Sequence, residues 1–139
     1  MRVLFVGFVW PEPKSSAAGQ NILSYIETFI RNGDEVSFCS AADTTEQSEN
    51  LAQLGVNTFV AQLNNSSFNQ QVADLAPHIV IFDRFLCFEQ FAWRIKQTCP
   101  KAMLVLDAED LHFLRKARHE MQKGSNELFM SSNEISTMS

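Results

Sequence analysis

The chain has 139 residues, of which 45% are apolar and 19% are charged, a balance typical of one globular domain with its own core. Its formal net charge of −5 argues against a general nucleic-acid binder, so we expect no nucleic-acid partner. No apolar run approaches the ~20 residues of a membrane helix, and the three scattered cysteines (Cys39, Cys87 and Cys99) indicate reduced thiols. We therefore expect a cytoplasmic protein with no transmembrane segment.

Short apolar runs alternate along the chain with segments of helical periodicity. The apolar runs predict five buried strands, at Arg2–Phe8, Glu35–Ala41, Val56–Ala61, His78–Phe82 and Ala102–Leu106. The periodic segments predict helices at Gly19–Asn32, at Asp43–Leu54, from near Ser66 to before Pro77, at Phe85–Thr98 and at about Leu111–Gln122. This order predicts an α/β fold, a Rossmann-like doubly wound parallel sheet of about five strands with helices on both faces. The third strand is the least apolar and is expected near an edge, and the tail Lys123–Ser139 is expected to hold one helical turn near Leu128–Met130.

The connection after the first strand, Val9–Ala18, is longer than the ~2–6 residues of most strand-to-helix loops, which indicates function. It does not carry the G-x-G-x-x-G fingerprint, because Gly7 and Gly19 stand alone. A dinucleotide or nucleoside-triphosphate site is therefore not expected. Gly19 lies at a predicted helix start, where free backbone N–H groups favour an anion, and a simple helix cap is the alternative interpretation.

Acidic residues follow the fifth predicted strand. Asp107, Glu109 and Asp110 come within four residues, with His112 and Arg115 soon after. Carboxylates this close repel one another unless a cation, a proton or a helix end relieves them. The next helix relieves Asp110, as an N-cap, better than it relieves Asp107. We interpret this cluster as a functional site, and partial relief by the helix start remains the alternative.

Asp83 and Arg84 follow the fourth predicted strand and should reach the same edge of the sheet. An internal ion pair is an equally good explanation of these two residues. A metal site built from Asp83, Asp107 and Glu109 is conceivable, but no ligand spacing requires it, so we expect no metal and no cofactor.

Three stretches together resemble the N-terminal domain of a two-domain, GT-B type glycosyltransferase of family 4 (group 1). The opening MRVLFVGFVWPEPKSSAAGQNILSYIETFIRNGDEV resembles that family's first strand, proline-containing loop and helix start, where the family often has Gly-Gly and this chain has Ala18-Gly19. PHIVIFDRF resembles the family's fourth strand, and LVLDAEDLHFLRKAR resembles its acidic segment. The resemblance covers about residues 1–120. Glu109 stands where many relatives have a histidine near the reacting sugar.

The resemblance implies an acceptor-side domain (residues 1–122) followed by a tail (residues 123–139), without the second, donor-binding domain of the family. The implied catalytic residues are Glu109, Asp110 and His112. The residues implied to bind substrate are Ala18, Gly19, Asp83, Arg84, Asp107 and Arg115. The implied partners are a nucleotide-sugar donor and an unknown acceptor in an intact enzyme, and the isolated chain is expected to be inactive.

Two other functions are compatible with the residues. A metal-dependent hydrolase would use Asp83 with the Asp107–Asp110 cluster, and a non-catalytic module of the flavodoxin or receiver type would share the alternating pattern. A receiver needs an acidic pair after its first strand, where this chain has Phe8-Val9-Trp10.

Two surface features complete the predictions. The basic run from Arg115 to Lys123 is most often a solvated helix face, although it could make peripheral contact with an anionic lipid surface. A sheet that ends after the fifth strand would expose an unpaired edge, which predicts self-association or docking of the tail.

Overall fold

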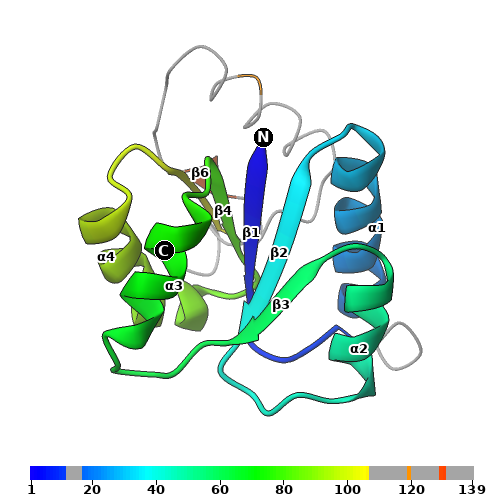
Figure 1. Ribbon diagram of the computed structural model, residues 1–139, viewed down its shortest axis with the longest axis horizontal. Coiled ribbons are helices and arrows are strands. Elements are labelled where there is room, and N and C mark those ends of the chain that lie inside the picture. The colour runs from blue at the N-terminus through cyan, green and yellow to red at the C-terminus, as the bar shows by residue number, and fades with distance from the viewer. Residues whose placement is uncertain (12–16, 107–118, 120–128, 131–139) are drawn as a thin grey trace.

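The computed structural model describes residues 1–11, 17–106, 119 and 129–130. They form one sheet with the strand order β3-β2-β1-β4-β5-β6, in which every neighbouring pair is parallel (Figure 1). The strands are β1 (Arg2–Gly7), β2 (Glu35–Ser40), β3 (Asn57–Val60), β4 (Ile79–Phe82), β5 (Met103–Leu106) and β6 (Phe129–Met130). The helices are α1 (Ala17–Arg31), α2 (Glu46–Gln53), α3 (Ser67–Leu75) and α4 (Phe85–Thr98). The predicted α/β class and the parallel Rossmann-like sheet are confirmed.

The strand order places β1 at the centre, between β2 and β4. This order is that of the Rossmann fold, whereas a flavodoxin-like sheet has the order 2-1-3-4-5. The order therefore argues against the flavodoxin or receiver type of module. β3 lies at an edge, as its weaker apolar character predicted. The order reverses between β1 and β4, which in this class of sheet is where ligands bind.

Two apolar layers cover the sheet. On one face, Tyr25, Ile26 and Phe29 of α1 pack with Leu51 of α2 on the odd-numbered residues of β1. On the other face, α3 and α4 pack on the even-numbered residues of β1, β4 and β5. Figure 1 shows α1 and α2 on one side of the sheet and α3 and α4 on the other. Because β1 is buried on both faces, its apolar run is continuous instead of alternating.

Helix starts differ slightly from the prediction. α1 begins at Ala17, so Ala18 and Gly19 belong to its first turn and not to the preceding loop. α2 begins at Glu46 instead of Asp43, because Thr45 caps it: the Thr45 hydroxyl accepts a hydrogen bond from the Gln47 N–H at 3.1 Å. These shifts leave the order of elements unchanged.

The tail contributes a strand where the sequence predicted a helical turn. Phe129–Met130 pairs with the carboxyl half of β5, in the register Val105 to Phe129 and Leu106 to Met130. The physical reason is the unpaired backbone that β5 would otherwise present. Docking of the tail, one of the two predicted outcomes at this edge, is therefore observed for these two residues. The predicted helix at about Leu111–Gln122 lies outside the described residues, apart from residue 119.

No helix in the described part of the chain has the length and apolar character needed to cross a bilayer.

Candidate functional site at the carboxyl edge of the sheet

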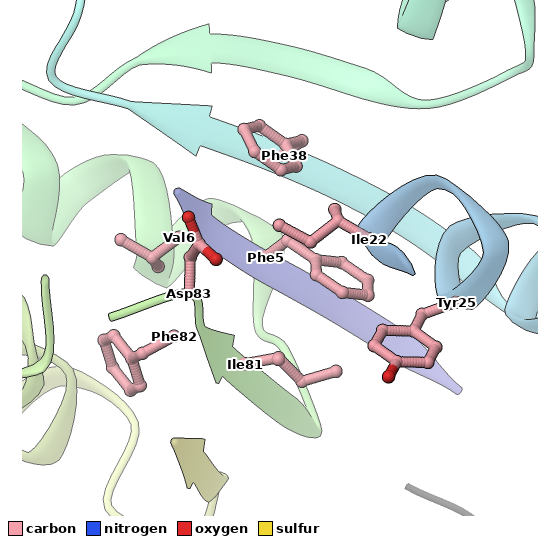
Figure 2. A pocket seen from close by; sticks show the side chains of 8 residues that line it. All are labelled: Phe5, Val6, Ile22, Tyr25, Phe38, Ile81, Phe82 and Asp83. Carbon is pink, nitrogen blue, oxygen red and sulfur yellow. The ribbon is translucent and has the colours of Figure 1, made fainter. Parts of the chain in front are cut away.

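The carboxyl end of β4 is hydrogen-bonded to the carboxyl end of β1, at the point where the strand order reverses. Val6 and Phe82 are partners in the ladder, and the Asp83 N–H donates to the Val6 carbonyl at 3.0 Å. Asp83 is half-buried, beside the tips of both strands (Figure 2). The parallel register therefore fixes this carboxylate at the edge where the Rossmann class binds its ligands.

A small cavity of about 20 Å³ lies beneath this point. It is lined by Phe5, Val6, Ile22, Tyr25, Phe38, Ile81, Phe82 and Asp83 (Figure 2). This volume has room for about one water molecule. The cavity itself is therefore too small to hold a sugar or a nucleotide.

An aromatic ring and a guanidinium meet on the open edge. The Arg84 Cζ atom lies 5.0 Å from the centre of the Phe8 ring, a cation–π contact between the loops that follow β4 and β1. Phe8 remains 41% exposed and Val9 49% exposed. Arg84 is the extended N-cap residue of α4. The edge thus presents a carboxylate, a fixed cation and an apolar surface within adjacent loops.

The first part of the loop after β1 is packed on its own domain. The Ser40 hydroxyl donates to the Phe8 carbonyl at 3.2 Å and accepts from the Ala42 N–H at 3.1 Å. The Trp10 indole N–H donates to the Ala42 carbonyl at 3.2 Å, and the ring packs 5.4 Å from that of Phe38. Trp10 is only 3% exposed. It is therefore an anchor that holds Phe8 in place, and not a ligand-binding side chain.

The structure places the predicted residues as follows. Asp83 and Arg84 follow the end of β4 and lie beside the end of β1, at the carboxyl edge of the sheet where the sequence placed them. Ala18 and Gly19 lie in the first turn of α1, so the backbone is helical there, and their side chains are not described. The predicted residues beyond β5 lie outside the described part of the chain: Asp107, Glu109, Asp110, His112 and Arg115.

The sequence reading missed Phe8 and Ser40. A large aromatic residue directly after a buried strand and before a proline-containing loop was the available signal for Phe8. Nothing in the sequence pointed to Ser40. Its hydroxyl donates to the Phe8 carbonyl between the ends of the neighbouring strands β2 and β1, and only the tertiary register brings these two groups together.

The cysteines do not supply a nucleophile to this edge. Burial raises the pKa of all three thiols, and for Cys87 the nearby Asp83 carboxylate raises it further, to about 11. A thiol with such a pKa is protonated at neutral pH and reacts slowly. Within residues 1–11, 17–106, 119 and 129–130, no group of three His, Cys, Asp or Glu side chains is placed to hold a metal ion.

Comparisons with known proteins connect this fold to solved structures only. No protein-family profile matches the sequence, and no curated protein matches it. Two similar solved structures are an α-glucosyltransferase in complex with UDP and a 13-mer DNA containing a HMU base, and an α-glucosyltransferase in complex with UDP and a 13-mer DNA containing a central A:G mismatch. Each superposes with a TM-score of 0.52 at 14% identity, over 94% and 100% of this chain respectively. The chain spans 37% and 39% of the lengths of these two structures. The comparison shows that its fold is like that of part of these glycosyltransferases.

Proposed function

We propose that this chain is the acceptor-side domain of a sugar-nucleotide-dependent glycosyltransferase. The observation that carries the proposal is the strand reversal between β1 and β4, which brings Asp83, Arg84 and Phe8 to one open edge of a glycosyltransferase-like fold. The two similar structures were solved with UDP, which supports a nucleotide-sugar as the donor class.

In this proposal each group at the edge has a separate task. The Arg84 guanidinium pairs with an anionic group of the substrate, such as a donor phosphate, while Phe8 supports one side of that cation. The Asp83 carboxylate accepts hydrogen bonds from sugar or acceptor hydroxyls. Glu109, Asp110 and His112 are proposed to line the acceptor side and to take the proton of the attacking hydroxyl.

The first test is ligand binding by the isolated chain, followed by amide chemical shifts. We expect UDP-glucose and UDP to bind weakly and to shift the amides of Phe8, Asp83 and Arg84. Arg84→Gln should weaken binding on the order of fivefold, because a charge-assisted contact is lost. Arg31→Gln is the matched control. Arg31 lies in the last turn of α1, which leads to the start of β2 and is far from the carboxyl edge, so this variant should bind like the wild type. Shifts confined to other surfaces, or equal binding by both variants, would contradict the proposal.

Turnover provides a second test. A donor site formed by a further domain is part of the proposal, so sugar transfer by the isolated chain should be negligible. Robust transfer by these residues alone would refute that dependence. A marked rise in melting temperature with Mg²⁺ or Mn²⁺ alone would instead favour the metal-dependent hydrolase.

A further inference from the structure

A shallow groove of about 580 Å³ runs along α3 to the end of α4. These two helices lie on the same face of the sheet (Figure 1). Ser66, Asn69, Gln70 and Ala73 line the groove at the three- and four-residue spacing that places side chains on one face of a helix, and Thr98 of α4 closes it. Its volume lies in the range of small-molecule sites, about 300–1,000 Å³. Because the lining face extends over two helical turns, the groove suits an elongated ligand.

Every hydrogen-bonding side chain that lines this groove is uncharged. These side chains are Asn65, Ser66, Ser67, Asn69, Gln70 and Thr98. Each carries a hydroxyl or an amide, a group that can both donate and accept. Within the described part of the chain, the hydroxyls of Ser66 and Ser67 make no hydrogen bond, so both are available to a ligand.

The charges that border the groove are already engaged. Arg94 Nη1 donates to Asn69 Oδ1 at 3.0 Å, and Gln70 Nε2 donates to Asp74 Oδ1 at 2.9 Å. These two charged residues have opposite signs, and neither lines the groove. A ligand therefore meets amides whose remaining atoms, Asn69 Nδ2 and Gln70 Oε1, supply one donor group and one acceptor.

The start of α3 does not offer an anion site beside the groove. The Ser67 N–H donates to Asn65 Oδ1 at 2.8 Å, and the Asn69 N–H donates to the Ser66 carbonyl at 3.0 Å. The N–H groups that would bind an anion at a helix start are thus occupied by the chain itself. Neither a cation nor an anion has a counterpart in this groove.

We propose that this groove binds a neutral oligosaccharide. Sugar hydroxyls both donate and accept, as the lining side chains do, and an oligosaccharide is elongated and uncharged. A protein partner would need apolar or aromatic anchors, and Ala73 is the only apolar residue among the lining residues. A single-stranded nucleic acid would need cations and stacking rings in the groove. No lining residue belongs to the candidate site, so the inference does not depend on the proposed glycosyl transfer.

The experiment titrates the full chain with maltotriose, cellotriose and chitotriose at millimolar concentrations, and NMR follows backbone and side-chain amides. We expect at least one of these neutral probes to shift the signals of Asn65, Asn69 and Gln70. Its monosaccharide should bind on the order of tenfold more weakly, because it reaches fewer of the lining groups. Trigalacturonate and the glucosamine trimer, which are charged, should also bind more weakly. Absence of shifts with all three neutral probes, or a preference for a charged one, would overturn the proposal. Displacement of the sugar by UDP would also overturn it and assign the sugar to the candidate site.

Ser67→Ala and Thr98→Val each remove one lining hydroxyl and should weaken binding on the order of fivefold. Ser24→Ala is the matched control, because Ser24 is an exposed serine of α1, on the opposite face of the sheet. It should bind like the wild type, and circular dichroism of all variants reports whether they fold. Equal affinities of the three variants would contradict binding in this groove.

Discussion

At the scale of single residues, Gly7 shows how closely the end of β1 is packed. A Cβ atom at this position would lie 2.9 Å from Phe38 Cε1 and 3.0 Å from the Val9 carbonyl oxygen, and closer still to Phe38 Cζ. Gly7 is therefore required for space rather than for an unusual backbone conformation. This close approach seats the Phe38 ring against both β1 and Trp10.

We predict that Gly7→Ala lowers the free energy of unfolding by about 1–3 kcal/mol, because a methyl group overpacks the core beside Phe38. Urea denaturation measures this loss. In the double variant Gly7→Ala with Phe38→Leu, the smaller side chain makes room, so the combined loss should be smaller than the sum of the two single losses. Strict additivity, or a neutral Gly7→Ala, would show that Phe38 does not set this constraint.

At the scale of elements, Arg2 and His78 join the amino ends of β1 and β4. The Arg2 N–H donates to His78 Nδ1 at 3.0 Å, and the His78 N–H donates to the Arg2 carbonyl at 2.8 Å. The Arg2 side chain also donates from Nε to the Ala76 carbonyl at 2.8 Å. Two Arg2 donors, the backbone N–H and the guanidinium Nη2, therefore face the His78 ring nitrogens Nδ1 and Nε2, at 3.0 Å and 3.5 Å, and disfavour the charged imidazolium.

This arrangement predicts a pH-dependent stability. Burial, and then the charges of Arg2 and the N-terminal amine, lower the pKa of His78 below its usual 6.5. The unfolded chain therefore binds the proton more readily. The contribution of His78 to stability is complete above pH 6.5 and is lost progressively as the pH falls from 6.5 through the lower pKa of the folded state. Between about pH 7.5 and pH 5.5 the melting temperature should fall less for His78→Gln than for the wild type. The exposed His119 supplies the control, and an equal pH dependence in His78→Gln and His119→Gln would contradict this role.

At the scale of the whole molecule, the β5 edge decides whether the sheet is free to pair with another chain. β6 covers Val105 and Leu106 of that edge with two residues of the tail. Without β6, the backbone of a fully buried, apolar strand would be available for pairing.

Deletion of residues 129–139 should therefore cause concentration-dependent self-association. Light scattering over a dilution series measures this change. Deletion of residues 131–139 alone keeps β6 and is the control, which should match the full chain. If both deletions behave like the full chain at every concentration, β6 does not protect the edge.

The sequence by itself determined the order and type of the elements from β1 to β5. Continuous apolar runs gave β1, β4 and β5, because parallel strands buried on both faces need no alternation. The apolar stripe with a proline just beyond its end predicted α4 with its observed bounds, Phe85–Thr98. The end of a strand is also a local feature of the sequence. Asp83 and Arg84 could therefore be named as candidate site residues from their position after the fourth apolar run.

Only the tertiary structure decided which of these elements are neighbours. The strand pairs, the contact of Arg84 with Phe8 and the hydrogen bond from Ser40 to the Phe8 carbonyl all join residues 20 or more positions apart, as Ser37 and Asn57 are in the closest case. Pairing of β6 with β5 likewise overrode a local preference in the tail, because hydrogen bonds to an open strand edge outweigh a single helical turn. Local periodicity carries no information on such long-range contacts, and these contacts build the carboxyl edge on which the proposed function depends.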